Sequence, residues 1–264
     1  MSNNVSLAIP FFQKPPPPPT MYLVSAAEEL WRCDLDNPEG ATKVADAPRV
    51  SSGYSLGFTG ISQTSDGNHL VVAGNTFNGR NTPSTRATLY TYYIQGSSWR
   101  GFAQFENFRF PTGVLSVAGI TRIGSTYYVP TSAEELWSTG STIPSGATKV
   151  GDFPAAIQHA RGLINIGNTL YIIDHEFSAS VIDRLFQCAP DNPAGATLVG
   201  EFPDTIQTVT DISEYGGVLY PLVYQGSGNP SELWRCDPGN PSGATKVGDF
   251  PASVEVRGIH VYEA

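Results

Sequence analysis

The sequence predicts an all-β chain in which one four-stranded unit is repeated. Three observations support this prediction: a near-identical segment recurs, an aromatic position recurs with it, and no window shows a long apolar pattern of helical period. The recurring segment is most complete at Glu29–Val44 and Glu232–Val247, and more divergent copies of equal length occupy Glu135–Val150 and Arg184–Val199. Because a copied supersecondary unit cannot bury its apolar face alone, the copies must pack on one another.

The aromatic position gives the period of the repeat. Its members are separated by 59, 47, 49 and 48 residues, and they are Trp31, Tyr90, Trp137, Phe186 and Trp234. Repeats of roughly 40–50 residues that carry several short strands are typical of propeller blades. Since a large aromatic side chain in a repeated position serves repeated packing, we expect Trp31, Trp137 and Trp234 to be buried between blades.

Each repeat divides into four short strands. In the third repeat, we expect strands at residues 119–123, 126–130, 135–138 and 147–150, separated by turns rich in Gly, Ser and Pro. The first-strand position is preceded by Gly in four repeats and by Asp211 in the fifth, and it recurs at Ile61, Ile120, Leu163, Ile212 and Ile259. These first strands predict a five-bladed β-propeller of four-stranded blades over residues 21–264.

The two ends of the predicted propeller complement each other. The chain enters at Met21–Val24, a second strand with no first strand before it, and leaves at Arg257–Tyr262, a first strand with no second strand after it. We therefore expect the strand around Ile259 to pair with Met21–Val24. This pairing would close the ring with strands from both termini and leave no blade edge open.

The charge of the chain argues against two classes of partner. It carries 24 acidic and 15 basic residues, a net charge of −9, without a basic cluster, which disfavours nucleic acid and anionic membrane surfaces. No apolar run reaches the length of a membrane span, and residues 1–10 lack the basic start of a secretory signal. We expect synthesis in the cytosol, with assembly into a particle released by lysis as one route out of the cell.

The cysteines occupy one position of three different repeats: Cys33, Cys188 and Cys236. Equivalent atoms in separate blades lie well apart, whereas a disulfide needs Cα atoms within roughly 7 Å. No CxxC motif marks a metal site either. We expect three buried, unpaired thiols that act as small hydrophobic side chains.

The Asn-Pro-x-Gly segments, each with the residue before it (residues 36–40, 191–195 and 239–243), allow two interpretations. Their Asp and Asn oxygens suggest calcium, but a calcium loop needs alternating oxygen donors and a bidentate Glu at its end. Asn-Pro and x-Gly also form turns by backbone geometry alone. We favour the turn interpretation and expect no metal and no cofactor.

Enzymatic activity is not expected. Some five-bladed propellers are glycosidases, which need two carboxyl groups at a fixed separation around the sugar. The candidate inner-strand positions are Ser62/Gln63, Thr121/Arg122, Ile164/Asn165, Ser213/Glu214 and His260/Val261. Asp211 and Glu214 are the acidic residues of the inner strands, and both lie on one strand, so they cannot flank a sugar from opposite sides. The four histidines have no nucleophile context.

Departures from the repeat are the candidate binding sites. Asp174, His175 and Glu176 interrupt a strand end that is small and neutral in other repeats. They suit a polar ligand or a cation, but we favour the alternative, a solvated loop with a local His–carboxylate pair. The insertion at residues 75–86 has two interpretations: a loop used for recognition, or sequence drift that the scaffold tolerates. Arg161, Arg257 and Asp211 begin inner strands, where they would ring the mouth of a central channel or hold water.

Residues 1–20 form a separate N-terminal arm. An apolar segment ends in Ile9, Pro10, Phe11 and Phe12, and Lys14 and five prolines follow. Five prolines favour an extended spacer of roughly 15 Å. Because exposed Phe11 and Phe12 would be a liability in a free tail, we expect residues 9–12 to dock on a protein assembly. The alternative is a tail without a partner.

In its near-identical repeats with little catalytic apparatus, the chain resembles the tachylectin-type propeller lectins over residues 21–264. The recurring Glu-Leu-Trp-Arg-Cys-Asp motif differs from the sugar-binding motif of that family, so no ligand residue carries over. A propeller on an apolar tether is also similar to accessory proteins of virus particles. Three functions follow as hypotheses: a recognition module for glycan or protein, a structural decoration protein, and a glycosidase.

Overall fold

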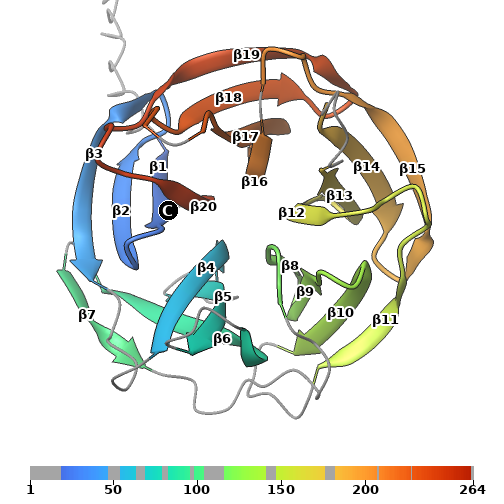
Figure 1. Ribbon diagram of the computed structural model, residues 1–264, viewed down its shortest axis with the longest axis horizontal. Coiled ribbons are helices and arrows are strands. Elements are labelled where there is room, and N and C mark those ends of the chain that lie inside the picture. Colours follow the sequence, from blue (N-terminus) through green and yellow to red (C-terminus); the bar gives the residue numbers. More distant parts are fainter. Residues whose placement is uncertain are drawn as a thin grey trace, which may run out of the picture.

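The computed structural model describes residues 19–46, 54–63, 69–78, 83–95, 98–103, 116–140, 147–175, 182–206, 208–226 and 228–262. All of its regular elements are strands, and they form five four-stranded antiparallel sheets around a common axis (Figure 1). The described segments contain no helix capable of crossing a membrane.

Four of the sheets repeat one layout, and we call them blades 1 to 4. From the axis outwards, blade 1 consists of β20 (Val256–Tyr262), β1 (Thr20–Ser25), β2 (Glu29–Asp34) and β3 (Asn37–Asp46). Blade 2 consists of β8 (Thr121–Ile123), β9 (Thr126–Pro130), β10 (Glu135–Gly140) and β11 (Thr148–Asp152). Blade 3 consists of β12 (Ala160–Ile166), β13 (Thr169–Asp174), β14 (Arg184–Ala189) and β15 (Asn192–Glu201). Blade 4 consists of β16 (Thr208–Tyr215), β17 (Val218–Tyr224), β18 (Glu232–Asp237) and β19 (Asn240–Asp249).

The remaining sheet differs from the four blades. It consists of β4 (Tyr54–Gln63), β5 (His69–Asn78), β6 (Pro83–Gln95) and β7 (Ser98–Ala103), and its first three strands are 10, 10 and 13 residues long. Its sequence is the degenerate copy of the repeat, without the Glu-Leu-Trp segment. The sequence predicts five four-stranded blades, one of them a degenerate copy; the structure confirms a propeller of four-stranded blades, with four regular blades and one divergent sheet.

The pairing expected between the two ends of the described chain is present. β20 runs antiparallel to β1, and Ile259 lies opposite Leu23. Each innermost strand also contacts its neighbours around the axis, in the order β4, β8, β12, β16, β20 and again β4. Figure 1 shows these strands nearest the axis, with β3, β7, β11, β15 and β19 at the rim.

Small residues allow the innermost strands to approach closely. A Cβ atom on Gly60 would lie 2.7 Å from the Cα atom of Gly119, and one on Gly162 would lie 3.1 Å from the Cα atom of Asp211. These positions follow register shifts in β4, β12 and β16, as expected for β-bulges near the axis. The Gly that precedes the first-strand residue in four of the repeats is therefore a packing requirement of the ring.

The apolar core lies between neighbouring sheets. One cluster joins Ile164 and Ile173 of blade 3 to Leu219 and Cys236 of blade 4, and equivalent clusters occur at other blade junctions. The prediction for the cysteines is confirmed, because all three are buried and unpaired. Burial raises the thiol pKa to about 12 for Cys33 and Cys236 and to about 11 for Cys188. A neutral thiol of this kind is a packing group rather than a nucleophile.

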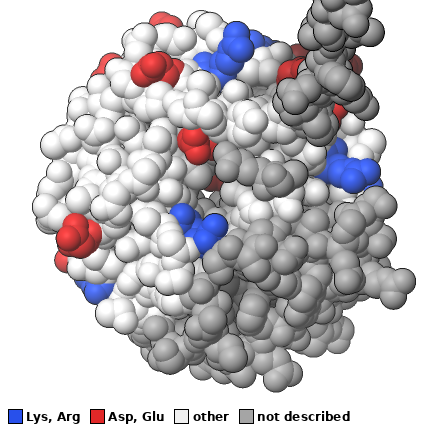
Figure 2. All heavy atoms as spheres, turned by 180° about the vertical axis from the view of Figure 1, so that it is seen from behind, with Lys and Arg blue, Asp and Glu red and all other residues white. Residues whose placement is uncertain are grey.

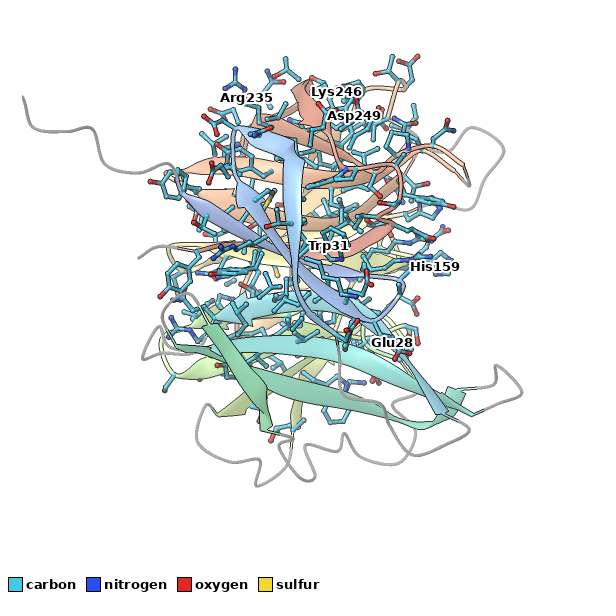
Figure 3. All side chains as sticks on the ribbon, turned by 90° about the vertical axis from the view of Figure 1, so that its left-hand side faces the viewer. Glu28, Trp31, His159, Arg235, Lys246 and Asp249 are labelled. Atoms are coloured by element: carbon cyan, nitrogen blue, oxygen red, sulfur yellow. The ribbon has the colours of Figure 1, made fainter. Side chains whose placement is uncertain are left out.

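The repeated tryptophans are half-buried, so the prediction that they are buried between blades holds only in part. Each packs against a junction cluster, but its indole nitrogen donates to the Glu two residues earlier, at 2.8–2.9 Å. The same Glu accepts a hydrogen bond from a Lys on the outermost strand, and that Lys also pairs with an Asp three residues later. Because the carboxylates and lysines need water, the indole edge must remain near the surface. Figure 3 shows Lys246 and Asp249 close together near the end of blade 4.

The Asn-Pro-x-Gly segments begin outermost strands instead of forming the turns themselves. Their prolines are buried, and each packs against a Gly of the neighbouring blade. A Cβ atom on Gly248 would lie 2.8 Å from Cγ of Pro38, and one on Gly151 would lie 3.0 Å from Cγ of Pro193. These contacts join β3 to β19 and β15 to β11. The segment thus joins adjacent blades at the rim.

Candidate functional site

A cavity of about 200 Å³ lies on the axis of the ring, and we call it the axial pocket. Its wall takes residues from the innermost strand of every sheet, and one polar residue from each is Gln63, Arg122, Asn165, Glu214 and His260. They are among the inner-strand positions that the sequence identifies. Figure 2 shows one face of the ring, with basic and acidic groups near its middle and mostly uncharged described surface around them.

Hairpin turns position three of these side chains. Arg122, Asn165 and Glu214 each lie two residues before a two-residue turn, and each turn begins with a Gly at a φ of 59–61°. Only Gly adopts this left-handed backbone at little cost. Arg122 donates from its guanidinium to the carbonyl of Gly124 at 2.6 Å, and Glu214 accepts from the amide of Gly217 at 2.7 Å. The turns therefore hold both charged groups near the pocket wall.

His260 is uncharged at neutral pH. Burial, together with the smaller effect of the positive charge of Arg122, lowers the pKa of its imidazole to about 4. The Nε2 atom is enclosed and has no hydrogen-bond partner within the described residues. Nearby, the Thr121 hydroxyl donates to Asn165 Oδ1 at 2.7 Å and so links β8 to β12. The pocket thus combines one neutral imidazole, one cation, one carboxylate and several uncharged polar groups.

The arginines predicted at the channel mouth lie beside bulges in two innermost strands. Arg161 is half-buried, and burial lowers its pKa; the carboxylate of Asp183 opposes this shift and the charge of Arg257 adds to it. Arg257 is exposed, stacks over the ring of Tyr224 at 5.7 Å and pairs with Glu255. The structure therefore brings Arg161 and Arg257 within electrostatic range of each other, with internal partners for Arg257.

Asp211 lies between two innermost strands of the ring. Its side chain is buried, and Oδ2 accepts a hydrogen bond from the Ile259 amide at 3.0 Å, which joins blade 4 to blade 1. Burial raises its pKa well above the ordinary value, against the hydrogen bonds from the Ile259 and Ile212 amides. Glu214 lies in the axial pocket, so the two acids of β16 occupy different environments.

Asp174 and His175 lie inside blade 3, so the alternative of a solvated loop is wrong for these two residues. Asp174 Oδ1 accepts from the amides of Gln158 and His159, each at 2.8 Å, and Oδ2 accepts from Arg184 at 2.5 Å. These bonds occupy both carboxylate oxygens. Glu176 lies outside the described residues.

His175 lies 2.6 Å from Asp183 through Nδ1, and Asp183 also accepts from the Val209 amide of blade 4. Burial raises the pKa of Asp183, while its bonds to Val209 and His175 oppose this rise. The arrangement links blade 3 to blade 4 through one buried carboxylate. It leaves the Asp174 and His175 side chains engaged within the fold.

In blades 1, 2 and 4 a Glu bonds both the Trp and the Lys of the repeat, whereas blade 3 has other residues at all three positions. Arg184, Phe186 and Leu198 occupy the positions that are Glu232, Trp234 and Lys246 in blade 4. Arg184 pairs with Asp174 on the adjacent strand and stacks over Phe186 at 5.6 Å, while Leu198 lies opposite Phe186. Without the Glu, neither an indole donor nor a Lys has its partner. The departure of blade 3 from the repeat at these three positions therefore exchanges one set of internal contacts for another.

No family model matches this sequence, and no curated protein matches it. Among solved structures, TolB from Acinetobacter baumannii aligns with a TM-score of 0.50 and 10% identity, over 92% of this chain and 66% of that one. The fold is a β-propeller. A family 117 glycoside hydrolase from Zobellia galactanivorans aligns with a TM-score of 0.49 and 11% identity, over 88% of this chain and 75% of that one. Identities this low show the fold alone.

The sequence interpretation missed the ligand potential of Arg122, Asn165 and Glu214. One signal was available: each precedes its turn Gly by two residues in the first strand of a repeat. His260 had a weaker signal, because no turn follows it within the described residues. The docking residues Ile9, Pro10, Phe11 and Phe12 lie outside the described residues, as do residues 79–82 of the insertion.

Proposed function

We propose that the chain forms a five-bladed propeller and acts as a recognition module without catalytic activity. In this proposal β4–β7 is the fifth blade, and the pairing of β20 with β1 closes the ring. The axial pocket binds a small polar ligand, such as the terminal unit of a glycan. The observation that carries the proposal is the convergence of polar side chains from all five innermost strands on one cavity, with His260 Nε2 lacking a partner in the described chain.

The chemistry of the pocket favours binding over hydrolysis. Glycoside hydrolysis requires two carboxyl groups on either side of the scissile bond. Glu214 is the one carboxylate among the described residues of the pocket, and Asp211 is buried in the ring wall with a bond to the Ile259 amide. Ser62, Thr121 and Asn165 add hydrogen-bond donors and acceptors, which suit recognition of a polyhydroxylated ligand.

The N-terminal arm gives the proposal its second part. Residues 9–12 dock on a protein assembly, the prolines at 15–19 act as a spacer, and the propeller is displayed beyond them. Phe11 and Phe12 are the anchors, because an apolar peptide that becomes ordered on binding must bury substantial area. A purely structural decoration protein has the same arm and binds no ligand in the axial pocket.

Two experiments test the proposal. A glycan array and a thermal-shift panel of sugars, sugar acids and amino acids should give binders with the wild-type protein and not with His260→Leu. If no compound binds, or if binding survives His260→Leu unchanged, the pocket is not the recognition site; release of a cleaved product would support the glycosidase instead. For the arm, Phe11→Ala/Phe12→Ala should fold normally but fail to join the native assembly, and normal incorporation would contradict the tether.

A further inference from the structure

We propose that the axial pocket is selective for a monosaccharide that carries a carboxylate, such as a hexuronate. Arg122 receives the carboxylate, and the other polar side chains of the pocket, His260 among them, receive the ring hydroxyls. This inference rests on the proposed function and adds the chemical class of the ligand. It requires the pocket to distinguish an acidic sugar from a neutral sugar of the same size.

The cation of the pocket is arranged to accept an anion. Arg122 is half-buried, and its bond to the Gly124 carbonyl engages one of the five N–H donors of the guanidinium. Within the described residues it forms no salt bridge. A carboxylate matches the planar fork of a guanidinium through two parallel hydrogen bonds, and partial burial strengthens the attraction. The turn therefore holds Arg122 in place, with donors that a ligand carboxylate can use.

The other polar groups of the pocket are arranged to form hydrogen bonds with hydroxyls. The enclosed Nε2 of His260 is a donor or an acceptor according to the tautomer, and a hydroxyl satisfies either form because it both donates and accepts. Asn165 and Gln63 offer amide groups, and Glu214 offers a carboxylate that can accept from a hydroxyl. These groups come from different strands around the axis, so they surround a ligand as the hydroxyls surround a sugar ring.

The size and charge of the pocket restrict the ligand further. A cavity of about 200 Å³ is smaller than the pockets that hold drug-sized molecules, and it suits a single sugar unit. The imidazole next to Arg122 is neutral, so the guanidinium is the positive group available to an anion. An amino acid also carries a carboxylate, but it has few further groups for the side chains of the other strands.

The test measures affinity of the full chain by isothermal titration calorimetry. The ligands are D-glucuronate and D-galacturonate, the neutral sugars D-glucose and D-galactose, and glycine, each with wild type and with Arg122→Gln, His260→Leu and Arg32→Gln. We expect the uronates to bind at least tenfold more tightly than the neutral sugars. Arg122→Gln should remove this preference, His260→Leu should weaken both classes, and the exposed control Arg32→Gln should change neither.

The outcomes separate the inference from the proposed function. If neutral sugars bind as tightly as uronates and Arg122→Gln changes nothing, the preference for a carboxylate is wrong while recognition in the pocket stands. Tighter binding of glycine than of the uronates would also overturn the inference. If no ligand binds to wild type, or if the affinities are insensitive to His260→Leu, both fail. A thermal melt of each variant confirms that it is folded.

Discussion

The Ile259 amide donates a hydrogen bond of 3.0 Å to Asp211 Oδ2, and this bond joins the innermost strands of blades 4 and 1. Gly occupies the position of Asp211 in the other innermost strands, at Gly60, Gly119, Gly162 and Gly258. Among the five copies of this repeat position, Asp211 is thus the one with a side chain that bridges adjacent blades. Its burial disfavours the charged form.

Asp211→Asn should stabilise the protein at neutral pH. The folded-state pKa of Asp211 is raised, so its contribution to stability is fully present below the unfolded pKa of about 4 and is lost as pH rises through the folded value. An amide remains neutral and keeps an oxygen for the Ile259 amide. Thermal melts should show a higher Tm for Asp211→Asn than for wild type at pH 7, with the gap closing at pH 4. An equal loss of Tm for Asp211→Asn and Asp211→Ala at pH 7 would contradict this.

His260 should make the protein sensitive to moderate acid. Its folded pKa of about 4 lies below the unfolded value of about 6.5, so its contribution is present above pH 6.5 and is lost as pH falls towards 4. The full difference corresponds to about 3 kcal/mol. Urea melts of wild type and His260→Gln between pH 7 and pH 4 should diverge by up to that amount. Parallel curves across this range would show that His260 does not titrate as a buried group.

Contacts between Pro and Gly at the rim should be needed for stability. Gly248→Ala places a methyl group 2.8 Å from Cγ of Pro38, and relieving this overlap should cost about 1–3 kcal/mol. Gly140→Ala is the matched control, because a methyl group there has no neighbour within 4 Å. The double variant Gly248→Ala/Pro38→Ala should recover part of the loss. Equal Tm values for Gly248→Ala and Gly140→Ala would rule out the contact.

Asp174→Ala should be strongly destabilising. The change leaves Arg184 and two backbone amides without their carboxylate, and breaking a buried ion pair costs about 3–5 kcal/mol. The control is Asp46→Ala, whose carboxylate pairs with Lys43 but is 76% exposed, and which should leave Tm nearly unchanged. Chemical denaturation of both variants checks the contrast. A small loss for Asp174→Ala would reopen a ligand role for this residue.

Repetition explains why much of the fold was predictable. The aligned first strands identify the innermost strands, and the unpaired strand patterns at the two ends predict the pairing of Ile259 with Met21–Val24. The burial of the tryptophans was overestimated because a hydrophobic position does not reveal that its indole nitrogen reaches a carboxylate two residues away. The Asn-Pro segments suggest turns locally, but their packing on Gly in another blade is a long-range contact.

The candidate site was predictable only in part. Asp174 and His175 are departures from the repeat. Sequence alone does not distinguish a ligand site from an ion pair inside the fold, such as that of Asp174 with Arg184. Arg122 and Glu214 look unremarkable one at a time, because their convergence depends on the ring bringing strands together that are far apart in sequence. Pocket residues of this kind emerge once the strands are placed in space.

The most direct test of the account is a nuclear magnetic resonance titration that follows the imidazole signals of the four histidines. D-Glucuronate is added to full-length protein labelled at histidine, and His260→Gln assigns the signal of His260. The account predicts a saturable shift of the His260 signal, with the signal of buried His175 unchanged, and in Arg122→Gln the same shift should need at least tenfold more D-glucuronate. An unmoved His260 signal at ligand concentrations that saturate the protein by calorimetry would contradict it.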